Sequence, residues 1–83
     1  MKVLQANSNY TMATAVRLTG VQPHRIRRYE KDNLLNLERT DGNQRLLSDK
    51  DIEIIKQAAK LEDEGINAAG IKVILAIRNG KRK

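Results

Sequence analysis

A helix stop and a helix start lie three residues apart in this chain, at Gly20 and Pro23. Gly commonly ends a helix in the left-handed conformation, and Pro suits the first position of a helix because its missing amide donor costs nothing there. Before Gly20 lies a short apolar face made of Ala13, Val16 and Leu18. The sequence therefore predicts two short helices joined by a tight turn over residues 19–22, which is the helix-turn-helix pattern.

The second of these helices is expected to run over residues 23–31. Ile26 and Tyr29 lie three positions apart in it and should both face inward. Asn33 can close the helix, because Asn tolerates the left-handed conformation better than most residues other than Gly.

A small hairpin is predicted directly after that helix. Residues 37–39 and 44–47 flank the sequence Thr40-Asp41-Gly42-Asn43, in which Asp-Gly is a strong signal for a hairpin turn. A hairpin at this place in the chain is typical of a wing. The predicted fold class is therefore mainly α: a winged helix-turn-helix with four helices and a small two-stranded hairpin wing.

Two more helices complete the predicted fold. Ser48 begins the third, with Asp51 placed to form a capping box, although Asp reaches back less well than Glu or Gln. The expected buried stripe of this helix consists of Ile52, Ile55 and Ala59. Gly65 ends the third helix and Asn67 caps the fourth. The predicted organisation is a flexible arm at residues 1–9, the winged helix-turn-helix domain at 10–79 and a basic tail at 80–83.

The fourth helix is more apolar than one buried face requires. One stripe at helical spacing consists of Ile66, Ala69, Gly70, Val73, Ile74 and Ile77. A second stripe beside it consists of Ala68, Ile71 and Leu75. Either the hairpin and the third helix wrap around both stripes, or the second stripe is left for another protomer or for a further C-terminal helix. The second stripe is thus the candidate dimer contact.

The distribution of charge favours a polyanionic partner. The net charge is +6, with seven Arg or Lys against four acids in residues 17–45, three against six in 46–64, and five against none in 65–83. Such blocks suggest one face that meets a polyanion and another that faces away from it. Chance clustering on a solvated surface would look the same, so charge alone does not decide.

Composition excludes several classes of function. With a single His and no Cys, a metal site has too few ligands, and without clustered carboxylates we expect neither an enzyme nor a cofactor. The lack of Cys, of a membrane-spanning apolar run and of a signal peptide fits a protein of the reducing cytoplasm that does not contact membranes. Two Tyr and no Phe or Trp argue against a stacking platform for single-stranded nucleic acid.

Several separated motifs resemble the MerR family of transcription regulators. In the helix-turn-helix these are Tyr10-Thr11-Met12, Leu18-Thr19-Gly20-Val21, Pro23-His24, Arg27, Tyr29-Glu30-Lys31 and Leu34-Leu35. In the wing they are Glu38-Arg39-Thr40, Gly42, Arg45 and Ser48. The segment over residues 64–72 resembles the branch that includes the nitrogen regulators GlnR and TnrA and the heat-shock repressor HspR. The resemblance implies a regulator at the nucleoid that binds double-stranded DNA sequence-specifically, as a homodimer on a palindromic site.

The resemblance also implies that the second helix enters the major groove. His24, Arg25 and Arg28 are then outward positions that can read base edges, because a guanidinium can take guanine O6 and N7 together. Arg27 matches the family's phosphate-contacting arginine. Tyr29 matches an aromatic position that is either chiefly structural or has its hydroxyl free for the DNA backbone.

The first helix and the wing are expected to contact the DNA backbone as well. The residues that match such family positions are Arg17 in the first helix and Arg39 and Arg45 in the wing, and Asn43 and Gln44 at the tip of the wing can donate to phosphates. The resemblance places Arg39 and Arg45 at or near the minor groove. The alternative for Arg39 is an exposed ion pair with Glu38 or Asp41, which would carry little energy.

The chain departs from the family at four positions. Ala13 stands where Ser or Thr often begins the first helix, Gln22 replaces a better capping residue, and Leu47 replaces an aromatic after the wing. These three are expected to cost stability or a wing contact. Arg28 stands where an aromatic is common and can alter which bases or phosphates are read.

Family members generally dimerise, often through a long antiparallel coiled-coil helix after the fourth helix, and no heptads remain here before Lys83. Either the chain is part of a longer protein, or it belongs with short members that rely on other contacts, such as residues 1–9 or the second stripe. No effector-binding residues can be identified. Two alternatives stay open: an excisionase-like DNA-architectural protein and, from another class, a protein-interaction or RNA-binding module.

Overall fold

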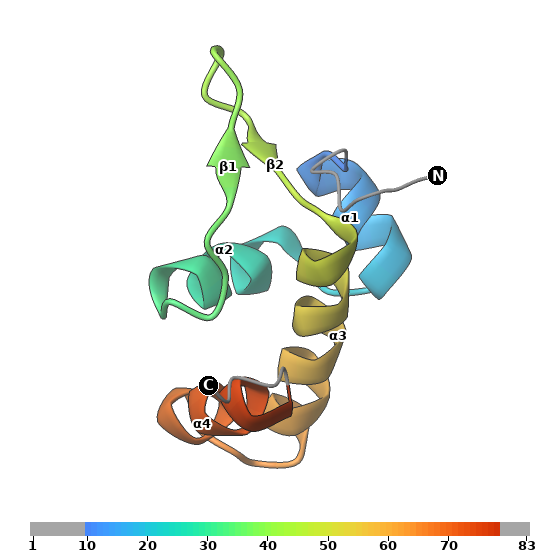
Figure 1. Cartoon of the computed structure of the whole chain (residues 1–83). Coiled ribbons are helices and arrows are strands. Elements are labelled where there is room, and N and C mark those ends of the chain that lie inside the picture. Colours follow the sequence, from blue (N-terminus) through green and yellow to red (C-terminus); the bar gives the residue numbers. More distant parts are fainter. Residues whose placement is uncertain (1–9, 79–83) are drawn as a thin grey trace, which may run out of the picture.

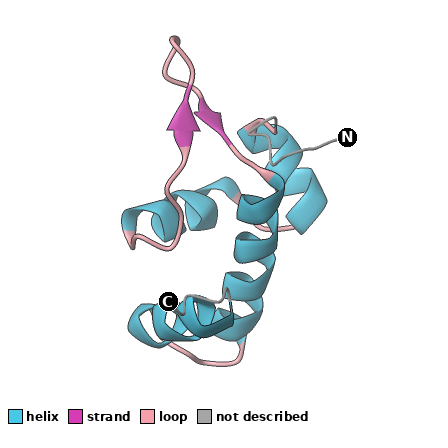
Figure 2. Ribbon diagram, in the orientation of Figure 1, coloured by secondary structure: helices cyan, strands magenta, loops and turns pink. Residues whose placement is uncertain are grey.

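The computed structural model describes residues 10–78, and six elements make up this part of the chain (Figures 1 and 2). They are α1 (Met12–Thr19), α2 (Pro23–Lys31), β1 (Glu38–Arg39), β2 (Arg45–Leu46), α3 (Asp49–Asp63) and α4 (Ala68–Arg78). The β1–β2 hairpin projects away from the helices, and α3 runs from the base of the hairpin to α4 (Figure 1). The predicted fold class is confirmed. The predicted arm and basic tail lie outside the described residues.

Local signals set the helix ends where the sequence predicts them. Gly20 has φ +74° and closes α1, and Pro23 is the first residue of α2. Asn33, after α2, has φ +64°. At the start of α3, the Ser48 side chain accepts from the Asp51 amide at 3.1 Å, and the Asp51 carboxylate accepts from the Ser48 amide at 2.8 Å. The predicted capping box is therefore present with both of its hydrogen bonds.

The wing is a two-stranded antiparallel ladder in which Arg39 pairs with Arg45. The Asn43 amide donates to the Thr40 carbonyl oxygen at 2.8 Å, and Asn43 has φ +68°. A β-turn followed by one residue in the left-handed conformation is a common type of hairpin loop. The Asp-Gly sequence turns the chain as predicted, but Asn43 rather than Gly42 takes the positive φ.

A single core lies between the four helices. Its largest fully buried side chains are Tyr29, Ile26, Leu47, Ile55 and Ile71. The inward positions predicted for α2 are thus confirmed, and the predicted α3 stripe is buried as well. Because Leu47 is completely buried, the residue that replaces the family's aromatic belongs to the core rather than to the wing surface.

The inward face of α1 differs in part from the prediction. Val16 packs against the core as expected, but Ala15 is the fully buried residue, whereas Ala13 is exposed and Leu18 is 48% exposed. The side chain of Thr11 caps this helix and accepts a hydrogen bond from the backbone at 3.2 Å. The lack of Ser or Thr at position 13 therefore costs no cap, because the cap lies two residues earlier.

Most of the second apolar stripe of α4 lies in the core, where Ile66 and Ile74 of the first stripe also pack. Ile71 and Leu75 are 2% and 5% exposed and lie in the core, whereas Val73 and Ile77 are 59% and 73% exposed. The predicted dimer contact is wrong for Ile71 and Leu75, and Ala68 is its one exposed member. Both stripes are apolar at helical spacing, so the sequence pattern alone does not say which of them packs against α3.

Candidate nucleic-acid interface

α2 presents a basic face to solvent. Its exposed positively charged or imidazole side chains are His24, Arg27, Arg28 and Lys31. Three of these are predicted DNA contacts, and Lys31 is not, although it follows Arg27 by four residues and so shares its side of the helix. Arg27 and Lys31 form no ion pair with any residue between 10 and 78.

A hollow of about 410 Å³ lies between the start of α1, α2 and the wing. Its lining consists of Thr11, Met12, Ala13, Arg27, Asn43, Gln44 and Arg45. The structure thus brings the predicted phosphate contact of α2, Arg27, together with three of the predicted wing residues. Arg17 is exposed on α1 and is not among the lining residues.

At the edge of this basic face, one carboxylate of α3, that of Glu62, binds three side chains of α2. Arg25 Nη2 donates to Glu62 Oε1 at 2.7 Å, and the Tyr29 hydroxyl donates to the same oxygen at 2.8 Å. Arg28 Nη2 pairs with Glu62 Oε2, and its guanidinium lies 5.6 Å from the centre of the Tyr29 ring. Arg25 also reaches Asp63 Oδ1 at 3.3 Å. Nothing near these residues in the sequence indicates this cluster, because its members lie 33 to 38 positions apart.

The pKa values in this cluster are shifted. Burial acts to raise the pKa of Glu62, but hydrogen bonds from Arg25 and Tyr29 and the charges of Arg28 and Arg25 hold it below its usual value. The hydrogen bond to Glu62 raises the pKa of Arg25. Burial, with the hydrogen bond to Glu62, raises the pKa of Tyr29 to about 12. With these shifts Glu62 is ionised, Arg25 is charged and Tyr29 is a neutral phenol at neutral pH, and the Tyr29 hydroxyl is engaged inside the protein.

A second glutamate joins α2 to the wing. Arg45 Nε donates to Glu30 Oε1 at 2.7 Å, and Arg39 Nη2 lies 3.3 Å from Glu30 Oε2. The Glu30 side chain is only 19% exposed. The ion pair expected for Arg39 as an alternative to DNA contact exists, but its partner is Glu30 on α2 and not Glu38 or Asp41.

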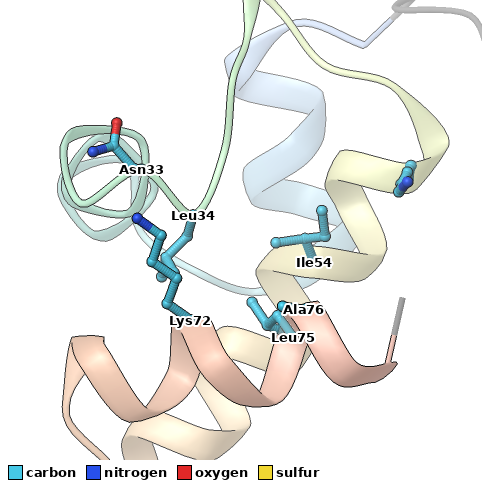
Figure 3. A pocket seen from close by; sticks show the side chains of 7 residues that line it. Asn33, Leu34, Ile54, Lys72, Leu75 and Ala76 are labelled. Atoms are coloured by element: carbon cyan, nitrogen blue, oxygen red, sulfur yellow. The ribbon is translucent and has the colours of Figure 1, made fainter. Parts of the chain in front are cut away.

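A second hollow, of about 300 Å³, lies between the end of α2, α3 and α4 (Figure 3). Leu34, Ile54 and Leu75 supply apolar lining, and Asn33 and Lys72 supply polar lining (Figure 3). It shares no lining residue with the hollow at the wing. Within residues 10–78, no group of three or more His, Asp or Glu side chains is arranged to hold a metal ion, and no helix is long and apolar enough to cross a membrane.

The family model for the MerR HTH family of regulatory proteins matches residues 10–76, most of the chain. The chain belongs to the MerR family. This is a family of regulatory proteins rather than of enzymes, in agreement with the sequence prediction.

Curated relatives and solved structures agree with this family. The chain is 41% identical to the putative heat shock protein HspR of Streptomyces coelicolor, over 84% of this chain and 47% of the relative. It is 39% identical to the transcriptional regulator GlnR of Bacillus anthracis, over 77% of this chain and 50% of the relative. HspR and GlnR are two of the three proteins named above for the branch that residues 64–72 resemble. The chain spans about half the length of these relatives.

Among solved structures, HiNmlR is a MerR family regulator lacking the sensor domain, bound to promoter DNA. This MerR-family chain matches it with a TM-score of 0.72 and 30% identity, over 78% of this chain and 50% of the HiNmlR chain. A MerR family transcriptional regulator from Bacillus cereus, at 24% identity and a TM-score of 0.70, has the same fold.

Proposed function

We propose that this MerR-family chain is the DNA-binding part of a transcription regulator, with α2 in the major groove and the wing on the sugar-phosphate backbone. The observation that carries the proposal is the hollow in which Arg27 of α2 meets Arg45, Asn43 and Gln44 of the wing. Guanidinium groups and side-chain amides are the donors that phosphate oxygens accept most readily. HiNmlR, which has the same fold, is bound to promoter DNA in its crystal structure.

In this proposal the residues divide into two groups. Those that hold phosphates are Arg17, Arg27, Arg39, Asn43, Gln44 and Arg45. Those on α2 that can reach base edges are His24 and Arg28, which lie four residues apart, whereas Lys31 shares the side of Arg27. Arg25 is half-buried against α3, so its main role is structural, unlike the base-reading role that the family resemblance implies. Two copies bind an inverted repeat, and the protein acts at the nucleoid.

The test is selection of duplexes from a random library by the full chain, followed by equilibrium binding to single-base variants of the enriched site. We expect an inverted repeat to be enriched. Arg27→Ala should weaken binding to all duplexes alike, because a phosphate contact carries no sequence information. Lys60→Ala, which removes an exposed positive charge on α3, is the matched control and should change little.

Failure to enrich any sequence, with no binding to random duplexes either, would refute the proposal. Footprints that cover several direct repeats, with bending of the duplex, would instead indicate an excisionase-like architectural protein. Preference for single-stranded RNA over every duplex would indicate the RNA-binding alternative.

A further inference from the structure

The carboxylate of Glu62 lies where it can set the orientation of the arginines on α2. It accepts from Arg25 and Tyr29 on one oxygen and pairs with Arg28 on the other. Its side chain is 33% exposed, so it is partly shielded from water. Partial burial strengthens its attraction for the guanidinium groups relative to an exposed pair.

The two arginines are held differently. Arg25 is 24% exposed and has two acidic partners, Glu62 and Asp63. Arg28 is 44% exposed and pairs with Glu62 through Nη2 alone. A guanidinium carries five N–H donors, so Arg28 keeps donors on Nε and Nη1 that no side chain among residues 10–78 occupies. Arg25 therefore links α2 to α3, while Arg28 is held in place and still has donors for a ligand.

We propose that Glu62 is a positioning residue for base reading: it holds Arg28 by one nitrogen so that the remaining donors face a base pair. This inference rests on the proposed function. A long, flexible side chain loses conformational entropy when it binds, and a partner that orients it beforehand reduces that cost. The ring of Tyr29 beneath the Arg28 guanidinium, at 5.6 Å, restrains the same group from below.

The variant that tests this is Glu62→Gln, which keeps an acceptor oxygen for Arg25 and Tyr29 but removes the charge that holds Arg28. Glu64→Gln is the matched control, because Glu64 is exposed, lies two residues away, and forms no ion pair with residues 10–78. Both changes remove one negative charge. A rise in affinity for all duplexes caused by charge alone should therefore appear in both variants.

The measurement is binding to the panel of single-base variants of the selected site. Glu62→Gln should lose about fivefold or more of its discrimination at one or two base pairs, the size of one oriented arginine–base contact, while Glu64→Gln keeps it. Arg28→Ala should lose discrimination at the same base pairs, and adding Glu62→Gln to it should cause no further loss.

Arg28→Lys keeps the protein folded even if Glu62→Gln does not, because it leaves Glu62 with Arg25 and Tyr29. Lys retains the charge but not the planar fork, so it should lose the same discrimination with an unchanged salt dependence. Equal discrimination by Glu62→Gln and Glu64→Gln, or full discrimination by Arg28→Lys, overturns the inference while the proposed function stands. If the unaltered chain prefers no duplex, the proposed function fails, and this inference fails with it.

Discussion

The wing arginines allow a quantitative test of DNA contact, because the structure shows which of their donors are free. Arg45 donates to Glu30 through Nε, and Arg39 donates to the same carboxylate through Nη2. Each therefore keeps terminal nitrogens that can bind a phosphate without leaving Glu30. We expect Arg39→Ala and Arg45→Ala each to remove one phosphate contact.

The size of the effect follows from counterion release. Each contact contributes about 0.9 to the slope of log affinity against log salt, so a fourfold rise in salt weakens binding by about 3.5-fold per contact and about 12-fold for two. The double variant should therefore be about 12-fold less sensitive to that rise than the unaltered chain. Fluorescence anisotropy with the selected and a scrambled duplex measures both slopes, and the change should be the same for both sequences.

Folding must be checked in the same experiment. Arg45→Ala removes the shortest ion pair of Glu30, whose side chain is 19% exposed, at a cost of about 1 kcal/mol after allowance for solvent. That corresponds to a fall in Tm of roughly 4–8 °C for a domain of this size. A slope that stays unchanged in a folded double variant would refute wing contact with the phosphates. Lys60→Ala, with a single charge lost from α3, should leave the slope near its original value.

Three further predictions follow from the structure. Gly20→Ala should lower the free energy of unfolding by about 1–2 kcal/mol through its φ of +74° alone, since a Cβ there meets nothing within 4 Å. Gly20→Asn should recover part of this loss, because Asn tolerates the left-handed conformation better than Ala. Thermal unfolding measures all three proteins, and equal stability would contradict this. Because folding lowers the pKa of Glu62, its ionised carboxylate stabilises the fold fully above the unfolded pKa of about 4.5, and this stabilisation is lost as pH falls through the lower folded pKa. In denaturant titrations at several pH values, the free energy of unfolding should therefore fall less steeply with acid for Glu62→Gln than for the unaltered chain. The same dependence on pH in both proteins would contradict this. The full chain should sediment at micromolar concentration as a monomer or weak dimer and bind an inverted repeat as two copies. A tight dimer in solution would contradict this. If that dimer were lost in a Val73→Asp, Ile77→Asp double variant, the interface would lie on the exposed residues of α4.

The sequence predicts the helix ends well, because the determinants of a helix end are local. Gly20, Pro23 and Asn33 act through their own backbone preferences, and Ser48 with Asp51 form a cap within four residues. None of these depends on a distant partner. Their agreement with the structure therefore follows from short-range physics.

The buried faces are predicted less well where two faces are equally apolar. On α4 the choice between Ile71 with Leu75 and Val73 with Ile77 is made by the approach of α3, which no spacing within α4 encodes. On α1 the shift to Ala15 has a similar origin, because small and apolar residues occupy several sides of a short helix. Such choices depend on tertiary packing rather than on periodicity.

In the candidate site, too, local features can be predicted from the sequence and long-range contacts cannot. The family motifs identify which side chains are basic and on which element they lie, and the structure places Arg27 with Arg45 at one hollow. The sequence does not indicate that Arg25 is engaged by Glu62, which lies 37 positions later. For Arg39 the expected partners are its acidic neighbours, but the base of the hairpin lies close enough to α2 for Arg39 to reach Glu30 instead. Long-range ion pairs of this kind need the fold before they can be identified.

The two glutamates explain how so small a wing can be held in a fixed position. Strands of two residues offer little cross-strand packing, and both residues of β1 are exposed, so the hairpin alone would be only weakly restrained. Glu30 ties both wing arginines to α2, and Glu62 ties α2 to α3 through Arg25, Arg28 and Tyr29. Four arginines thus share two glutamates, and Arg25 also reaches Asp63, so the cluster around Glu30 is the one that keeps a net positive charge for a polyanion. These arginine side chains are ordered when the protein folds, so α2 and the wing bind a duplex as one preformed surface. Less conformational entropy is therefore lost on binding.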